Sequence, residues 1–317
     1  MIVVVGGTGL LGRNVVGRLV SRGLPVRVVS RDAAHGRAAL GTLADRVELV
    51  EADVRDPGTL GAAVAGADTV VAAVQGFGGR DAGGIGAVDR DGNRNLVRAA
   101  AAVRVPHFLL LSLHDASAAD VLALGRAKAA VEAELRRMSM TPLVIRPTAY
   151  METWAGIVGG PILATGRARV FGRGTNPINF VSADDVAAVV EETLLDADAM
   201  ASGRTVEAVG PEDLSFDDLA ARFAAALGRP VPVSHVPLAV LRGMALLLRP
   251  VKPLLADQVA AAVVLDTTDR RGVVAASTAR AGRVAIVRSG ATTFDTVIAR
   301  FVAAGAATAK GGARAGA

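Results

Sequence analysis

The first twelve residues of the chain constrain its fold more than any other segment. Residues 2–5 are all hydrophobic, which is typical of a strand buried on both faces, and a helical hydrophobic pattern begins at Val15. Between them lies a glycine-rich segment made of Gly6, Gly7, Thr8, Gly9, Leu10, Leu11 and Gly12. Glycine permits a positive φ and a close approach of the backbone to a ligand, and a helix starting here directs unpaired N–H groups at an anion. We predict that this loop binds the diphosphate of a dinucleotide; the alternative is a turn that only packs.

Apolar runs alternate with helical segments through the first half of the chain. The runs cover residues 2–5, 26–30, 47–50, 69–74, 108–112 and 143–146. This alternation predicts an α/β fold, a Rossmann-type doubly wound parallel sheet, whose ligands bind at the carboxyl ends of the strands. After residue 150 the alternation of apolar runs and helical segments becomes less regular. We therefore expect an NAD(P)-binding Rossmann domain over residues 1–150, a small C-terminal α/β substrate lobe over 151–303 that is interleaved with the core, and a disordered tail over 304–317.

Composition and charge disfavour several classes of function. The net charge is +5, from 35 basic and 30 acidic residues spread along the chain, and this does not favour nucleic-acid binding. The chain has no cysteine and only four scattered histidines, so we expect no disulfide and no metal site. No signal-peptide pattern is present, and the most apolar later stretch, residues 237–248, is shorter than the ~20 residues that span a bilayer. We expect a cytoplasmic protein with no transmembrane segment, in which residues 237–248 form a buried helix or one that contacts a membrane surface or a partner.

Polar and small residues follow the later predicted strands. Arg31 lies 19 residues after the last glycine of the loop (31 − 12), where such folds keep an acid for the ribose of NAD(H) or an arginine for the 2′-phosphate of NADP(H). A guanidinium suits a phosphate dianion, so we predict NADP(H) rather than NAD(H). The alternative is a solvated Arg31 with Asp32 on the ribose. Asp53 and Val54 are expected at the adenine, unless Asp53 is only a turn residue, and Ala73 leaves room for the nicotinamide ribose.

The sequence resembles the NmrA-like type of atypical short-chain dehydrogenases/reductases. The resemblance is carried by the glycine loop, by residues 30–32 and 53–54, by Lys128 with the four residues after it, and by residues 146–148 and 180–187. It covers residues 1–190 well and the remainder loosely. It implies an NAD(P)H-binding Rossmann-type domain with a small C-terminal substrate lobe.

The chain departs from this family at the expected catalytic pair. Members with full dehydrogenase chemistry use Tyr-x-x-x-Lys, in which the tyrosine moves a proton and the lysine holds the nicotinamide ribose. Here Lys128 is present, but Leu124 stands where the tyrosine is expected, and a leucine cannot transfer a proton. Lys128 is the candidate to hold the ribose; the alternative is a solvated helix lysine. The resemblance also places Pro147 and Tyr150 near the nicotinamide, with packing as the alternative for Tyr150.

His114 is the candidate to replace the missing proton donor. It follows the predicted strand at residues 108–112, and its ordinary pKa of ~6.5 permits proton donation near neutral pH. The alternative is a loop histidine that only makes local hydrogen bonds. The aromatic and apolar residues after the sixth strand are expected either to line an apolar substrate pocket or to form a core; they are Met151, Trp154, Phe171 and Phe180.

Two classes of function follow from these features. The first is an NADPH-dependent oxidoreductase that reduces a small apolar acceptor such as a quinone or a conjugated carbonyl, since a reduced quinone can take its proton from water or from a histidine. The second is a non-catalytic NADP(H)-binding redox sensor or regulatory or scaffold protein, which Leu124 favours directly. An epimerase or dehydratase acting on nucleotide sugars is disfavoured by the missing tyrosine. The sequence does not determine the physiological acceptor, the hydride face, the oligomeric state or a protein partner.

Overall fold

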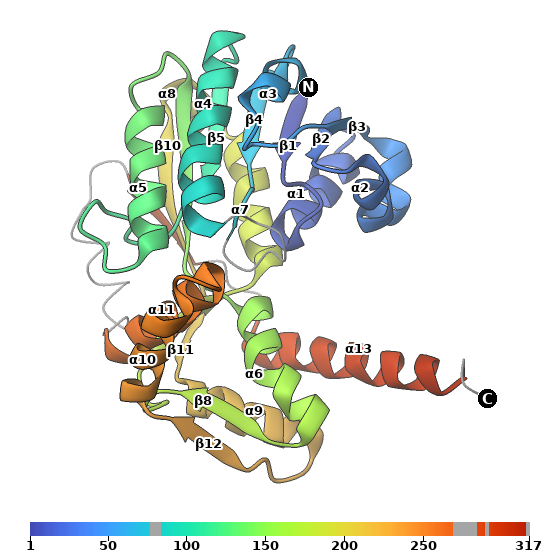
Figure 1. The fold of residues 1–317 in the computed structure, drawn as a ribbon. Coiled ribbons are helices and arrows are strands. Elements are labelled where there is room, and N and C mark those ends of the chain that lie inside the picture. Colours follow the sequence, from blue (N-terminus) through green and yellow to red (C-terminus); the bar gives the residue numbers. More distant parts are fainter. Residues whose placement is uncertain (77–83, 269–283, 289–291, 315–317) are drawn as a thin grey trace. The chain divides into compact units, whose positions relative to one another are not determined.

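The chain divides into two compact units in a computed structural model that describes residues 1–76, 84–268, 284–288 and 292–314 (Figure 1). The first unit consists of Met1–Pro147, Val186–Ala208 and Arg280–Val287, and the second of Thr148–Asp185, Val209–Ala279 and Arg288–Ala317. The chain therefore leaves the first unit after Pro147, close to the boundary predicted at residue 150, and returns to it twice. The roles predicted for the two regions, coenzyme binding and substrate binding, stay predictions.

An eight-stranded sheet forms the centre of the first unit, in the order β3-β2-β1-β4-β5-β6-β10-β13. Every recorded pair from β3 through β10 is parallel. The strands are β1 (Ile2–Val5), β2 (Val26–Ser30), β3 (Glu48–Glu51), β4 (Thr69–Ala72), β5 (His107–Leu111), β6 (Thr141–Pro147), β10 (Arg204–Val209) and β13 (Val284–Arg288). All four residues of β4 are buried, as expected for an apolar strand covered on both faces. The predicted Rossmann-type parallel sheet is confirmed.

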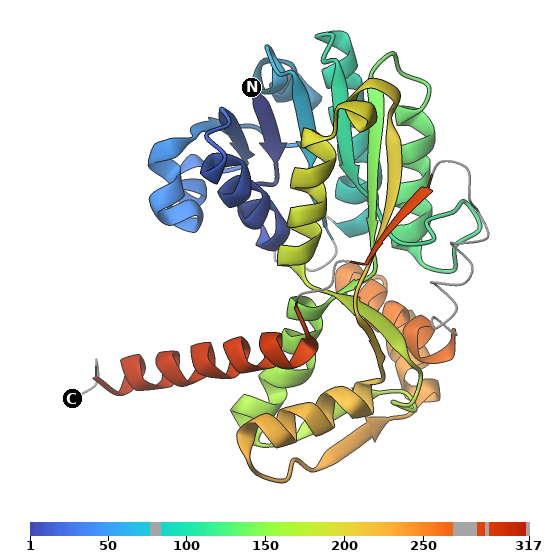
Figure 2. The same cartoon turned by 180° about the vertical axis from the view of Figure 1, so that it is seen from behind.

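Helices cover both faces of this sheet. Figure 1 shows α3, α4 and α5 over one face, and Figure 2 shows α1 and α7 over the other. The α7 carboxylate of Glu191 accepts bonds from Arg18 of α1 and from Arg22 at its C-cap, which ties these two helices together. The helical segments of the unit are α1 (Leu10–Ser21), α2 (Ala33–Leu40), η1 (Gly41–Arg46), α3 (Pro57–Val64), the π-helix η2 (Ile85–Gly92), α4 (Asn93–Ala102), α5 (Ala123–Leu135), α7 (Ala183–Leu195, which begins in the second unit) and α8 (Ala197–Ser202).

The second unit has its own sheets and its own aromatic core. Its elements are β7 (Ala149–Tyr150), α6 (Met151–Thr165), β8 (Ala168–Phe171), β9 (Ile178–Val181), β11 (Glu212–Leu214), α9 (Phe216–Leu227), β12 (Val233–Val236), α10 (Leu238–Leu248), α11 (Pro253–Thr267) and α13 (Phe294–Arg314). The strands pair as β11-β9-β7 and as β12-β8. The rings of Trp154 and Phe216 lie 4.9 Å apart, and those of Phe180 and Phe294 lie 5.2 Å apart edge to face. Trp154 and Phe180, two candidates for a substrate pocket, are thus buried in the core of this unit.

The last helix runs further than its sequence pattern suggests. The apolar pattern that begins at Phe294 predicts a helix ending near residue 303, but α13 continues through Arg314. The helix therefore occupies much of the segment expected to be a disordered tail, because alanines such as Ala303, Ala304, Ala306 and Ala307 favour helix without adding to an apolar stripe. Residues 315–317 of that predicted tail lie outside the described residues. In the described part of the chain, none of the helices is both long enough and apolar enough to cross a membrane.

Candidate active site

The carboxyl ends of the parallel strands lie at one edge of the sheet. Val5 is paired with Val29 on one side and with Ala72 on the other, so β1, β2 and β4 end level. The strand order reverses at β1, because the chain runs outward to β2 and β3 and then returns to β4, and such a reversal is where these sheets bind ligands. The residues predicted after the strands therefore lie along this edge: the glycine loop after β1, Arg31 after β2, Asp53 after β3, Ala73 after β4 and His114 after β5.

The glycine loop has a backbone that requires its glycines. Gly6 has a φ of 85°, and a Cβ there would lie 2.8 Å from the carbonyl oxygen of Ala73. A Cβ on Gly12 would lie 2.2 Å from the carbonyl oxygen of Gly6, so only glycine lets α1 pack this closely against the loop. Gly9 stands at the N-cap of α1, no side chain caps the helix, and its first turn contains no acid. The N-terminus of α1 thus offers backbone N–H groups and a positive dipole end to an anion.

Arginines surround the carboxylate of Asp53. The Nε of Arg55 lies 3.0 Å from both Asp53 Oδ1 and Oδ2. This hydrogen bond lowers the pKa of Asp53 below its usual value against the effect of burial, and the charge of Arg31 lowers it further. Val54 is buried in the hydrophobic core under α4, where the Nδ2 of Asn95 donates to its carbonyl oxygen over 3.0 Å. The structure thus brings Arg31 and Asp53 together, while the contacts of Asp53 and Val54 with an adenine stay predictions.

Asp32 has a structural role in this edge. Its Oδ1 accepts the backbone N–H of His35 at 2.9 Å, which caps the N-terminus of α2. The cap accounts for an acid at this position without a coenzyme. The cap uses one oxygen of Asp32, and both Arg31 and Asp32 are exposed, so the choice between them at the ribose stays a prediction.

Lys128 is buried and paired. Its side chain is 3% exposed, its Nζ lies 3.4 Å from Asp89 Oδ1, and it donates to the carbonyl oxygen of Val74 at 3.5 Å. The other oxygen of Asp89 accepts the N–H of Gly76 at 2.9 Å. The alternative of a solvated helix lysine is therefore wrong, because Lys128 faces the segment after β4. Asp89, from η2, fixes both the lysine and the backbone of that segment.

An apolar cluster occupies the position of the family tyrosine. Leu124 is buried with Ile85 and Ala127, and Leu113 and Ala123 pack against them. Leu124 lies one helical turn before Lys128, so both side chains are on the same face of α5. A reacting group next to Lys128 would thus meet hydrocarbon here, with no hydroxyl from this position to donate a proton.

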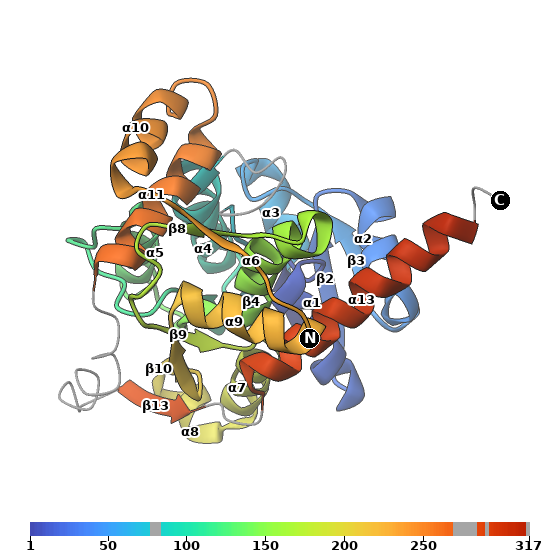
Figure 3. The ribbon, with the colours of Figure 1, turned by 90° about the horizontal axis from the view of Figure 1, so that it is seen from below.

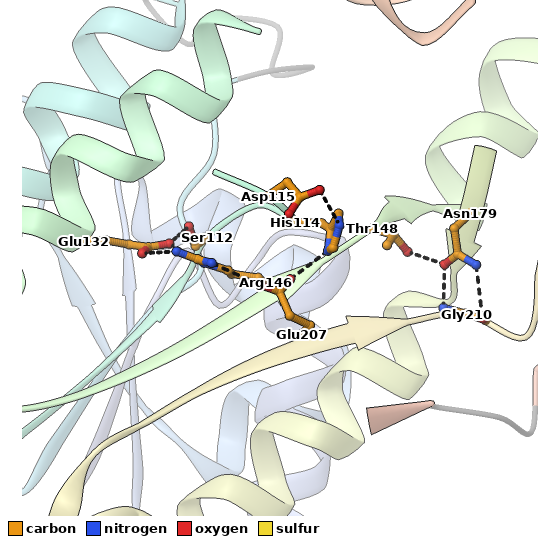
Figure 4. Close-up of polar contacts among 9 residues, drawn as sticks. All are labelled: Ser112, His114, Asp115, Glu132, Arg146, Thr148, Asn179, Glu207 and Gly210. Carbon is orange, nitrogen blue, oxygen red and sulfur yellow. Dashed lines mark hydrogen bonds and ion pairs between the residues drawn. The ribbon is translucent and has the colours of Figure 1, made fainter. Parts of the chain in front are cut away.

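A chain of buried charges continues from α5 across β6 (Figure 4). Glu132 accepts the hydroxyl of Ser112 at 2.5 Å, and Arg146 donates its Nε at 2.9 Å and its Nη2 at 2.7 Å to the two carboxylate oxygens. Burial alone would raise the pKa of Glu132, but the bonds from Arg146 and Ser112 hold it below the usual value. The Nη1 of Arg146 also reaches Glu207 of β10 at 3.1 Å. Arg146 is therefore clamped between two buried carboxylates.

His114 ends this chain of charges. Its Nδ1 lies 2.7 Å from Glu207 Oε2, and its Nε2 lies 3.0 Å from Asp115 Oδ2 (Figure 4). Burial disfavours the charged imidazole, but the hydrogen bonds to Asp115 and Glu207 outweigh it and raise the pKa of His114 to about 9. Asp115 adopts a φ of 55°, which is unusual for a non-glycine residue, and its side chain is 41% exposed. His114 is thus a buried cation at neutral pH whose outer neighbour reaches solvent.

The two residues predicted near the nicotinamide belong to different units. Pro147 ends β6 in the first unit, and its carbonyl oxygen accepts the backbone N–H of His114 at 2.9 Å. Tyr150 belongs to the second unit, where β7 pairs with β9, and burial raises the pKa of its phenol above the usual range. In that unit the amide oxygen of Asn179 accepts the Thr148 hydroxyl at 3.0 Å and the Gly210 N–H at 2.8 Å, as Figure 4 shows.

Comparison with known proteins identifies the family. Residues 1–266 match the NmrA-like family. The chain belongs to this family. The resemblance inferred from the sequence is therefore confirmed, and it extends well beyond residue 190. Within the described residues, no group of three or more His, Asp or Glu side chains is placed to hold a metal ion.

This NmrA-like protein is similar both to reductases and to an assembly factor. It is 27% identical to an NAD(P)H azoreductase of Xenophilus azovorans, over 73% of this chain and 75% of the relative. It is also 27% identical to the photosystem II assembly factor Ycf39 of a Synechocystis strain, over 77% and 72% of the two chains. Its fold superposes on the NADPH-dependent quinone oxidoreductase of Escherichia coli complexed with NADPH, with a TM-score of 0.70, 21% identity and coverage of 95% and 100%. At that identity the structural likeness shows the shared fold.

Four charged residues of this NmrA-like edge are missed by sequence reasoning: Arg55, Asp89, Asp115 and Glu207. Asp89 lies in a segment whose charges are typical of a solvated loop and helix. Glu207 carries a detectable signal, because a carboxylate inside the apolar run of β10 must find a partner when the strand is buried. Arg55 follows Asp53 by two residues, a spacing that permits a local ion pair but does not require one.

Proposed function

We propose that this NmrA-like protein is an NADP(H)-dependent reductase of a small, mostly apolar acceptor, with a quinone or a conjugated carbonyl as the expected class. One observation carries the proposal: the edge that holds the open glycine loop also holds an apolar cluster around Leu124 where a phenol donor is expected. The reductases among its relatives support the same reading. A nucleic-acid partner is not expected, and the cytoplasmic location stays a prediction.

The residues at this edge fit the coenzyme. The backbone of residues 6–12 would hold the diphosphate, since no side chain caps α1 and the helix directs its N-terminus there. Arg31 would meet the 2′-phosphate, and its charge already acts on Asp53. Lys128 would hold the nicotinamide ribose over the small side chain of Ala73, exchanging its long contact with Asp89 for ribose hydroxyls. When bound, NADPH supplies a hydride.

The remaining chemistry falls to the protein and the solvent. A quinone that has accepted a hydride still needs one proton on its anionic oxygen. We assign that proton to His114, which is charged at neutral pH and is linked to solvent through Asp115. Transfer of the Nε2 proton to that oxygen, which would replace Asp115 Oδ2 as the partner of Nε2, leaves a neutral imidazole, and a proton from solvent restores the charged form by way of Asp115. Glu207 positions the ring from behind and stabilises its charged form.

Binding and turnover are measured separately to test the proposal. Calorimetric titration with NADPH and NADH is expected to show preference for NADPH, and Arg31→Asp is expected to reduce the affinity ratio at least about tenfold while Arg37→Asp, an exposed arginine of α2, leaves it unchanged. An unchanged ratio in Arg31→Asp refutes the phosphate assignment.

Turnover is followed as loss of the reduced-nicotinamide absorbance with a panel of quinones and enals. We expect acceptor-dependent oxidation that His114→Asn slows at least about tenfold and that the exposed-site control His35→Asn does not change. Tight NADPH binding with no oxidation by any acceptor of the panel overturns the reductase proposal and supports the redox-sensor alternative. Full activity of His114→Asn refutes the role of this histidine alone.

A further inference from the structure

Exposed hydrophobic side chains concentrate on one part of the second unit. Among the described residues, half of the large hydrophobics that are exposed lie between residues 240 and 255, on α10, α11 and the turn joining them. Leu246, Leu247 and Val251 are the extreme cases, with exposures of 73%, 76% and 75%. Exposing several apolar side chains to water is unfavourable, so a cluster of them indicates a surface that binds a partner or a membrane.

The α10–α11 hairpin is anchored to the second unit mainly through α11, whereas α10 is little buried. The helices lie side by side (Figures 1 and 3), and Leu241 is the single residue of α10 that is fully buried. On α11 the buried side chains are Ala256, Val259, Ala261, Ala262 and Asp266, and the carboxylate of Asp266 accepts bonds from Arg173 and Gly174. The end of α10 and the turn after it therefore present their leucines and valine outward, away from the residues that anchor the hairpin.

The charge around these residues has one sign. From residue 219 through residue 256 the sequence contains no Asp or Glu. Arg242, Arg249 and Lys252 stand within or beside the apolar segment, and all three are exposed. Long cationic side chains beside exposed leucines can reach phosphates while their stems lie on hydrocarbon. This combination matches the interface of an anionic bilayer, where each basic residue near the surface contributes to binding.

The hairpin suits attachment to a membrane surface rather than insertion across it. α10 has 11 residues, so at a rise of ~1.5 Å per residue it is about half as long as the hydrocarbon core is thick. A helix of this length with apolar residues at its end and cations beside them can lie in the headgroup region.

We propose that the α10–α11 hairpin docks this protein on the surface of membranes that contain anionic lipids. Leu246, Leu247 and Val251 enter the interface, while Arg249 and Lys252 bind headgroup phosphates. This docking does not depend on the reductase activity proposed above, although it would bring the protein to apolar molecules dissolved in the bilayer.

The test is flotation of the full chain with vesicles of phosphatidylcholine alone or mixed with phosphatidylglycerol. We expect binding to the mixed vesicles, weakened by salt, and little binding to the neutral ones. Leu246→Ser with Leu247→Ser is expected to lower the partition coefficient at least about tenfold, because two apolar side chains lose their transfer free energy. The matched control is Val121→Ser with Leu195→Ser, which removes exposed apolar side chains elsewhere and is expected to change nothing.

A second pair of variants distinguishes the effect of the basic residues on the hairpin from the effect of the protein's net charge. Arg249→Glu with Lys252→Glu is expected to weaken binding to the mixed vesicles more than about thirtyfold, since each cation contributes roughly fivefold near an anionic surface and the new carboxylates add repulsion. Arg137→Glu with Arg300→Glu makes the same change in net charge at exposed positions elsewhere and is expected to weaken it much less. Equal losses in the two charge variants, or unchanged binding in the leucine variant, overturn the proposal. The proposal is also overturned if light scattering shows a dimer that the leucine variant converts to a monomer, and vesicles capture neither protein.

Discussion

The buried ion pair of His114 makes the stability of the protein depend on pH in a defined direction. The bonds to Asp115 and Glu207 raise the pKa of His114 from 6.5 to about 9 in spite of burial. The folded protein therefore holds this proton more tightly than the unfolded chain does. The stabilisation is fully present below about pH 6.5 and is lost as the pH rises through about 9.

The size of the effect follows from the two pKa values. A difference from 6.5 to about 9 corresponds to about 3 kcal/mol of unfolding free energy, since one pKa unit is worth about 1.4 kcal/mol. His114→Asn cannot carry the charge, yet its Nδ2 can donate to Glu207 in place of the imidazole Nδ1. We therefore expect the difference in unfolding free energy between wild type and His114→Asn to be about 3 kcal/mol larger at about pH 6 than at about pH 10, in favour of the wild type.

Urea unfolding followed by far-ultraviolet circular dichroism measures this difference. Curves for wild type and His114→Asn are collected between about pH 6 and about pH 10, and only the difference between the two proteins is interpreted, because other groups titrate equally in both. His35→Asn, at an exposed position, serves as the control. A free-energy difference between wild type and His114→Asn that does not change with pH would refute the charged, ion-paired state of this histidine.

Three further substitutions test close contacts and a buried ion pair, each within one of the two units. Gly12→Ala, whose Cβ would lie 2.2 Å from the Gly6 carbonyl oxygen, should lower the melting temperature and abolish NADPH binding in calorimetry. Glu132→Ala removes one of the two buried carboxylates that pair with Arg146. It should lower the free energy of unfolding in urea by about 3–5 kcal/mol. Gly210→Ala, whose Cβ would lie 1.5 Å from a main-chain oxygen of β9, should destabilise the second unit, measured by the fluorescence of the one tryptophan.

Each of these substitutions has a matched control. Gly17→Ala lies on α1 with its nearest neighbour 3.8 Å away, and Gly160→Ala lies on α6 with nothing within 4 Å, so both should leave stability unchanged or slightly higher. Glu132→Gln keeps the size of the side chain and one acceptor, so it should cost less than the alanine variant. Equal losses in a glycine variant and its control would contradict the close contacts, and wild-type stability of Glu132→Ala would contradict the buried ion pair.

The sequence predicts the coenzyme-binding part of the edge because its requirements are local. Within residues 2–12 the strand, the glycines and the start of the helix are adjacent, and the glycine at position 12 is required by a contact within the loop, with the carbonyl oxygen of Gly6. The residues after the strands can be predicted in the same way. Parallel strands in aligned register end at one edge of the sheet, so strand order alone places Arg31, Asp53 and Ala73 there.

The partners of the ionisable groups could not be predicted in this way. His114 and Glu207 are 93 residues apart in sequence, and Lys128 meets Asp89 only because η2 packs on α5. Such contacts depend on which strands are neighbours and on which helices cover which face, so a local pattern shows a histidine after a strand but not whether it is free or paired.

The amino-acid sequence by itself determined the fold class, the glycine loop at the end of the first strand and the absence of a tyrosine four residues before Lys128, because these depend on hydrophobic period, on backbone freedom at glycine and on side-chain chemistry. Tertiary structure decided the charge state of His114, the burial of Lys128 and the outward position of Leu246 and Leu247. These properties arise from desolvation and from contacts between segments distant in the chain, and neither exists until the chain has folded.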